Sequence, residues 1–180
     1  MIKKINWDTY YIAQTFLIAQ KSIDPSTKCG AIWVSENNIP LSEGYNGPLQ
    51  NIDDDRVPLT RPEKYFWMIH AEENCLLSYN GGIGEIENSK MYITGRPCYR
   101  CLRMMLRKGI KKIIYAGIDA ICIDEKDMKA QLAMLELKPD VEVIKFDNIN
   151  DVKDLFNKSI FYIDDRWGKK EEGIIDILLK

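Results

Sequence analysis

The only histidine of the chain, His70, stands two residues before Glu72, and a later motif places Cys98 and Cys101 three residues apart behind Pro97. Imidazole nitrogen and thiolate sulfur are preferred zinc ligands, and three such ligands leave a fourth coordination position open for water. Cysteines three residues apart on a helix share one face and can hold one ion. We therefore predict that His70, Cys98 and Cys101 bind Zn2+.

Glu72 is not one of the three predicted ligands, so we expect it to have a different role in the reaction. Zinc lowers the pKa of bound water from about 16 toward neutrality, and a nearby carboxylate can take that proton and pass it to a reacting base. A His-x-Glu motif followed by Pro-Cys-x-x-Cys is the signature of zinc hydrolases that deaminate nucleobases. We expect attack at C4 of a cytosine ring, with Glu72 delivering protons to N3 and to the departing amine.

The three remaining cysteines are Cys29, Cys75 and Cys122. An odd total of five at irregular spacing does not resemble a disulfide framework. Without a second histidine, they cannot complete another site of the same kind. We expect them to be buried thiols.

Both motifs are expected at helix N-termini, where free N–H groups and the positive end of the helix dipole favour thiolate over thiol. Hydrophobic periodicity and turn residues predict helices over 7–21, 71–80, 98–108 and from Asp124 onward, and strands over 29–35, 39–45, 90–94, 111–116 and 141–146. Alternating strands and helices predict an α/β fold. The expected architecture is a three-layer α/β/α sandwich with a mixed five-stranded sheet.

The chain is expected to form one deaminase domain over residues 1–150 and a C-terminal extension over 151–180. The extension contains Phe156, Phe161, Trp167 and an apolar run at 174–179, so it is too apolar for a solvated tail. We expect it to pack on the domain or on a neighbouring subunit.

Charge and hydropathy argue against two kinds of partner. Lysine and arginine number 25 against 27 acidic residues, and this balance lacks the basic surplus typical of polynucleotide-binding proteins. No apolar run is long enough to span a membrane, and the first residues lack the apolar core of a signal peptide. We expect a cytoplasmic protein that binds neither polynucleotide nor membrane.

Three further stretches carry a resemblance to a known family. Residues 24–31 (DPSTKCGA), 44–47 (GYNG) and 64–74 (KYFWMIHAEEN) resemble the deoxycytidylate deaminases of the cytidine-deaminase-like superfamily. The resemblance extends over about residues 7–146. It implies a cytidine-deaminase-like fold that hydrolyses dCMP to dUMP and ammonia, with the zinc ligands and Glu72 in the roles given above.

The resemblance also implies substrate contacts. Asn46 is expected to hydrogen-bond the sugar, and Ala71 is expected to lie beside the substrate. By charge, Lys28, Lys64 and Arg61 are candidates for the phosphate, the alternative being that each is a solvated surface group. Where the family often carries a tyrosine that holds the base, residues 117–120 contain no aromatic side chain.

Assembly and regulation follow from the same resemblance. It implies a hexamer that dCTP activates and dTTP inhibits, with the effector near Gly44, Tyr45 and Gly47. Carboxylates at 53–55 would need a divalent cation such as Mg2+ to approach a triphosphate. The alternatives are a plain Asn-Gly turn at the first segment and a solvated acidic loop at the second.

Other functions remain open at this stage. The same zinc chemistry serves deaminases of other cytosine nucleotides and deaminases of adenosine in tRNA. A zinc-stabilised binding module without activity is a third alternative, but a structural zinc site closes with four ligands and has no use for a free carboxylate such as Glu72.

Overall fold

The computed structural model describes residues 4–82, 86–118 and 123–157. Its centre is a five-stranded sheet in the order β2-β1-β3-β4-β5. The strands are β1 (Gly30–Val34), β2 (Pro40–Tyr45), β3 (Lys90–Gly95), β4 (Lys112–Ile118) and β5 (Glu142–Lys145). β1 is antiparallel to β2 and to β3, whereas β3, β4 and β5 are parallel. The predicted mixed five-stranded sheet is confirmed.

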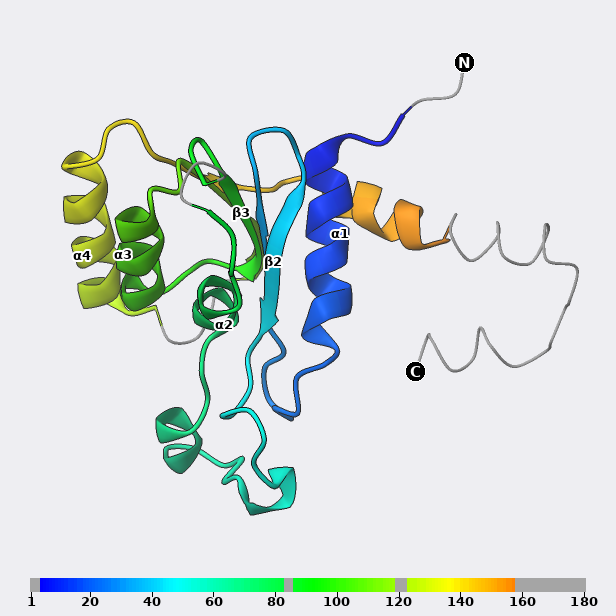
Figure 1. Cartoon of the computed structure of the whole chain (residues 1–180), viewed down its shortest axis with the longest axis vertical. Coiled ribbons are helices and arrows are strands. Elements are labelled where there is room, and N and C mark those ends of the chain that lie inside the picture. Colours follow the sequence, from blue (N-terminus) through cyan, green and yellow to red (C-terminus); the bar gives the residue numbers. More distant parts are fainter. Residues whose placement is uncertain (1–3, 83–85, 119–122, 158–180) are drawn as a thin grey trace, which may run out of the picture.

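Helices cover both faces of the sheet (Figure 1). α1 (Trp7–Ala19) lies on one face together with a helical stretch at 149–157. α2 (Ala71–Leu77), α3 (Tyr99–Lys108) and α4 (Glu125–Glu136) lie on the other. Each face carries its own cluster of buried apolar side chains, as a strand buried on both sides requires. The predicted α/β/α layering is confirmed.

The helix boundaries have local causes that the sequence had indicated. The Asn6 side chain accepts a hydrogen bond from the Thr9 N–H at 2.7 Å and caps α1. Asp124 caps α4 in the same way, accepting from the Asp127 N–H at 2.8 Å. Gly109 ends α3 with φ at 87°, a left-handed conformation that glycine adopts without strain.

One glycine sets how closely α2 approaches the sheet. A Cβ atom at Gly44 in β2 would lie 2.3 Å from the backbone nitrogen of Cys75 and 2.5 Å from the carbonyl oxygen of Ala71. Both atoms belong to the backbone of α2, so no side-chain movement could relieve the contact. Gly44 therefore allows α2 to lie directly on β2.

The segment between β2 and α2 projects from the body of the protein (Figure 1). It contains the short 3-10 helices η1 (Asp54–Arg56) and η2 (Glu63–Phe66). Its two ends are joined by a pair of backbone hydrogen bonds between Gly47 and Ile69, at 3.1 and 2.8 Å. Since Ile69 precedes His70, this closure fixes the start of α2 relative to the end of β2.

The described part of the C-terminal region packs on the α1 face. Val152 is buried, and Leu155 and Phe156 pack against the same cluster. Phe161, Trp167, the run at 174–179 and Cys122 lie outside the described residues. The proposed division into 1–150 and 151–180 stays a prediction. Among the helices that the structure describes, none has the length and apolar character needed to cross a membrane.

Candidate active site

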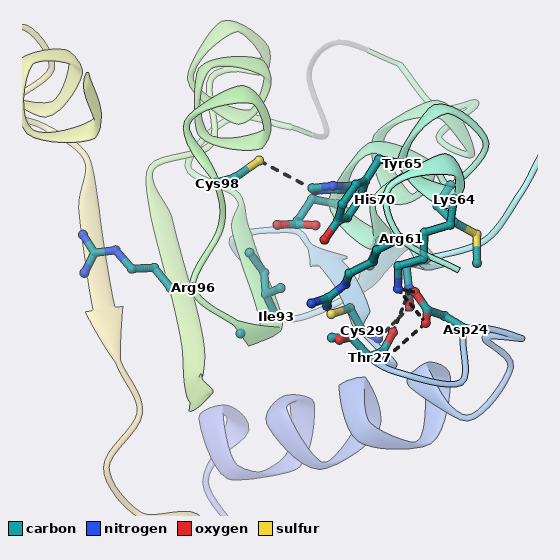
Figure 2. Close-up of a pocket in the computed structure, with 15 residues that line it drawn as sticks. Asp24, Thr27, Cys29, Arg61, Lys64, Tyr65, His70, Ile93, Arg96 and Cys98 are labelled. Atoms are coloured by element: carbon teal, nitrogen blue, oxygen red, sulfur yellow. Dashed lines mark hydrogen bonds and ion pairs between the residues drawn. The ribbon is translucent and has the colours of Figure 1, made fainter. Parts of the chain in front are cut away.

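The three predicted zinc ligands meet at the N-termini of two helices. His70 is the N-cap residue of α2, Cys98 is the N-cap residue of α3, and Cys101 lies in the first turn of α3. Their ligating atoms all lie within 4.8 Å of one another. Figure 2 shows the side chains of His70 and Cys98 directed toward each other.

The distances within this cluster fit a tetrahedral zinc ion. Nδ1 of His70 lies 3.6 Å from Sγ of Cys98 and 3.4 Å from Sγ of Cys101. Nitrogen and sulfur ligands at about 2.0 and 2.3 Å from a tetrahedral zinc ion lie roughly 3.5 Å apart. The three side chains thus have both the donor atoms and the spacing that zinc requires.

The three side chains of the cluster shift one another's pKa. The hydrogen bond to Cys98 raises the pKa of His70 to about 9, although burial opposes the shift. A hydrogen bond from Cys101 lowers the pKa of Cys98 to about 4. The hydrogen bond with Cys98, together with burial, holds the pKa of Cys101 above its ordinary value. The lowered pKa favours the thiolate of Cys98, which is the form in which cysteine binds metals.

Glu72 lies beside the ligands without belonging to their cluster. It is 5% exposed, lies in the first turn of α2 and lines the same pocket as His70 and Cys98. Burial raises the pKa of its carboxyl above the ordinary value, and a hydrogen bond with Cys101 opposes that shift. A raised pKa brings a carboxyl closer to the range in which it can both accept and donate a proton.

Asn46 lines the pocket, but its amide already has protein partners. Its Oδ1 accepts a hydrogen bond from the Cys29 N–H at 2.7 Å. Its Nδ2 donates to the Thr27 carbonyl at 2.9 Å and to Oδ2 of Asp24 at 3.5 Å. Asn46 therefore holds the loop that leads into β1 against the end of β2. The expected sugar contact stays a prediction, and it would have to use the second lone pair of Oδ1.

Lys64 is not a solvated surface group, so that alternative is wrong. It is 2% exposed, and its ammonium donates to both carboxylate oxygens of Asp24, at 2.7 and 2.9 Å, and to the Ser26 hydroxyl. Figure 2 shows this pair at one side of the pocket. The Lys64 charge is thus neutralised by Asp24. Lys28, by contrast, is exposed and is not among the residues lining the pocket, and its expected substrate contact stays a prediction.

Arg61 is the remaining candidate for the phosphate. It lines the pocket from the projecting segment, and within the described residues it forms no ion pair. Its guanidinium lies 5.8 Å from the centre of the Tyr65 ring, and both side chains point into the pocket (Figure 2). Arg96 also lines the pocket, but its guanidinium is directed away from His70 toward β4 and α4.

Several pocket residues were not predicted from the sequence. Asp24 stood inside a family-like stretch, but its ion pair with Lys64 joins residues 40 positions apart, which no local pattern reveals. Tyr65, Met68 and Ile93 line the pocket through the same long-range packing. Ala71 lines it as expected and is fully buried. In the stretch without an aromatic side chain, residues 119 and 120 lie outside the described residues.

The predicted effector residues have structural contacts of their own. Gly44 packs on α2, Gly47 pairs with Ile69, and the Tyr45 carbonyl accepts a hydrogen bond from the Asn74 side chain at 2.8 Å. These contacts account for the conformation of residues 44–47 without a bound effector, so the effector role stays a prediction. The acidic residues at 53–55 are exposed, and Asp53 caps η1.

This chain is similar in sequence to deaminases of cytidine and deoxycytidylate. A family model described as the cytidine and deoxycytidylate deaminase zinc-binding region matches residues 5–117. The deoxycytidylate deaminase of Mus musculus is 33% identical over 117 residues, a match that spans 62% of this chain and 65% of that protein. The human deoxycytidylate deaminase is 32% identical with the same coverage. The match thus spans just under two thirds of each relative's length.

A solved structure extends the likeness beyond the matched sequence. The dCMP deaminase of the cyanophage S-TIM5, in complex with dCMP and dUMP, superposes with a TM-score of 0.60 at 25% identity. The superposition covers 81% of this chain and 100% of the phage protein.

Proposed function

Because this chain belongs to the cytidine and deoxycytidylate deaminase zinc-binding family, we propose that it catalyses zinc-dependent hydrolysis of dCMP to dUMP and ammonia. The observation that carries the proposal is the cluster of His70, Cys98 and Cys101 beside the buried carboxyl of Glu72. His70, Cys98 and Glu72 line one pocket. The mouse and human relatives and the cyanophage protein support dCMP as the substrate.

The chain's own residues divide the work. His70, Cys98 and Cys101 hold the zinc ion, which when bound supplies a water molecule acidified to near-neutral pKa. Glu72 takes the proton of the attacking water, passes a proton to N3 of the cytosine ring, and then delivers one to the departing amine. Its burial keeps bulk water from competing for those protons.

We assign the 5′-phosphate of the nucleotide to Arg61. Arginine suits this task because its planar guanidinium forms paired hydrogen bonds with phosphate oxygens. Lys64 is excluded from it by its ion pair with Asp24, and Arg96 is held by partners on β4 and α4. Tyr65, next to the guanidinium, offers an aromatic surface at the same side of the pocket.

The family resemblance extends the proposal to assembly and control. We infer a cytoplasmic homohexamer that dCTP activates and dTTP inhibits, with Mg2+ accompanying the triphosphate. An effector changes activity only if it binds two states of the enzyme unequally. The expected signature is a sigmoidal dCMP rate curve that dCTP makes hyperbolic and dTTP shifts to higher substrate concentration. Hyperbolic curves that neither nucleotide alters would refute the regulation and leave the zinc chemistry intact.

A turnover assay across substrates tests the proposed reaction. Purified, zinc-loaded protein is given dCMP, CMP, dCTP, deoxycytidine, cytidine and tRNA, and released ammonia is measured. The proposal predicts the highest kcat/KM for dCMP. A preference for deoxycytidine would refute the phosphate contact, inosine formation in tRNA would favour a polynucleotide editor, and no turnover with any substrate would indicate a binding module.

A further inference from the structure

α4 reaches across to the metal-ligand turn through two buried polar side chains. The Asp127 carboxylate accepts hydrogen bonds from the Tyr99 backbone N–H, at 3.0 and 3.1 Å to its two oxygens. Nε2 of Gln131, one turn further along α4, donates to the Pro97 carbonyl at 2.9 Å and to Asp127. Asp127 is 6% exposed and Gln131 is fully buried. The residues on both sides of Cys98 are therefore held from α4.

A third contact extends the same network. Oε1 of Gln131 accepts a hydrogen bond from Nε of Arg96 at 3.2 Å, and the guanidinium of Arg96 continues to the Tyr115 hydroxyl in β4 at 3.3 Å. Hydrogen bonds thus hold the Arg96 side chain, the Pro97 carbonyl and the Tyr99 N–H. Within residues 96–99, it is the Cys98 side chain that contacts His70.

The position of Asp127 has a specific physical reason. The first N–H groups of a helix lack partners within it, and the N-cap side chain normally supplies an acceptor. Cys98 is the N-cap of α3 and makes no such side-chain bond, because its sulfur faces His70 instead. Asp127, from another helix, supplies an acceptor for the first of these N–H groups, that of Tyr99. A carboxylate is well suited to this place because it also meets the positive end of the α3 dipole.

We propose that Asp127 and Gln131 are positioning residues for the metal site, which fix the Cys98 thiolate in the orientation that binds zinc. This inference rests on the proposed zinc site, but it concerns residues that touch neither the metal nor the substrate. Hydrogen-bond partners behind the ligands typically change metal affinity by about 10- to 100-fold when they are removed. The network acts on the backbone around the ligand, not on the sulfur itself.

Zinc release tests the proposal directly. Zinc-loaded wild-type protein and the variants Asp127→Ala, Gln131→Met and Asp127→Asn are mixed with a chromophoric chelator, and the release rate is recorded. We expect Asp127→Ala and Gln131→Met to release zinc about 10- to 100-fold faster than wild type. Asp127→Asn keeps an oxygen that can accept from Tyr99 and should stay within about 3-fold. Glu136→Ala, at an exposed position of the same helix, is the matched control and should leave the rate unchanged.

Thermal unfolding with and without zinc separates positioning from general stability. If Asp127 and Gln131 only stabilised the fold, their variants would lower the Tm of the zinc-loaded and zinc-free forms equally. If they position the metal site, the variants should have a smaller Tm difference between the two forms than wild type has. Wild-type release rates in both Asp127→Ala and Gln131→Met, or an unchanged Tm gap, would overturn the proposal. Asp127→Asn releasing zinc as fast as Asp127→Ala would overturn the hydrogen bond as its basis. If Asp127→Ala does not fold, Gln131→Met carries the test. Wild-type protein that binds no zinc would overturn the proposed function as well.

Discussion

Replacing Lys64 with methionine should destabilise the whole domain, because it leaves the Asp24 carboxylate buried without its cation. The two side chains are only 3% and 5% exposed, and the ammonium lies 2.7 Å from the nearer carboxylate oxygen. Methionine keeps most of the volume of the lysine stem, so the change removes the charge and its hydrogen bonds more than the packing.

The expected magnitude follows from this burial. Removing one partner of a buried ion pair typically costs about 3–5 kcal/mol, because the remaining charge stays away from water without compensation. The chain offers a matched control in the Lys111–Asp140 pair, whose side chains are 38% and 54% exposed. Exposed pairs contribute about 0–1 kcal/mol, so Lys111→Met should have little effect.

Thermal unfolding of the two variants gives the comparison. In a chain of this size each kcal/mol shifts the Tm by about 2–4 °C, so Lys64→Met should lower it by roughly 6–20 °C. Adding Asp24→Asn to Lys64→Met should recover part of that loss, because the buried charge is then absent. If Lys64→Met unfolded within about 2 °C of wild type and only the KM for dCMP rose, the ion-pair reasoning would be refuted. Lys64 would then be the phosphate contact that its charge alone had suggested.

Three more predictions follow from the same structure. Gly44→Ala should lower the free energy of unfolding by at least about 1–3 kcal/mol and weaken zinc binding, because its Cβ would lie 2.3 Å from the α2 backbone. Gly82→Ala is the control: its Cβ would meet open space, so urea titrations should show an unchanged free energy of unfolding. Burial raises the pKa of Asp24, but hydrogen bonds from Lys64 and Ser26 outweigh it and hold the pKa below 3.8. The stability that Asp24 contributes is therefore present above the unfolded-state pKa and lost as pH falls through the lower folded-state pKa. The difference in unfolding free energy between wild type and Asp24→Asn should shrink between about pH 5 and pH 2, and a difference that grew on acidification would contradict this sign. Arg61→Gln should raise the KM for dCMP about 10-fold or more, while the turnover of deoxycytidine, which has no phosphate, stays unchanged. Arg56→Gln, in the same exposed segment, is the control. If both variants changed the KM equally, Arg61 would not be the phosphate contact.

Local signals in the sequence were enough to place most of the fold. Asparagine and aspartate at positions 6 and 124 favour helix caps, and capping depends on only a few adjacent residues, so the sequence alone indicates where these two helices begin. The spacing of Cys98 and Cys101 indicated a shared metal site for the same reason, and the structure brings both within reach of His70.

Contacts between distant elements could not be predicted in this way. Lys64 looked like a surface charge because only the folded chain brings it to Asp24. No local pattern singles out Asp127 and Gln131, because their burial depends on how α4 packs beside α3. Gly44 belonged to a turn-like segment, but the close approach of α2 is what requires a glycine there.

The central claim is that a zinc ion held by His70, Cys98 and Cys101 and the carboxyl of Glu72 together deaminate dCMP. The most direct test measures dUMP formation and zinc content in the same preparations of wild type and Glu72→Gln, which preserves the shape of the side chain but cannot shuttle a proton. We predict about one zinc per chain in both proteins and turnover at least ~100-fold lower in the variant. Near-normal turnover by Glu72→Gln, or full activity in wild-type protein without zinc, would contradict the account.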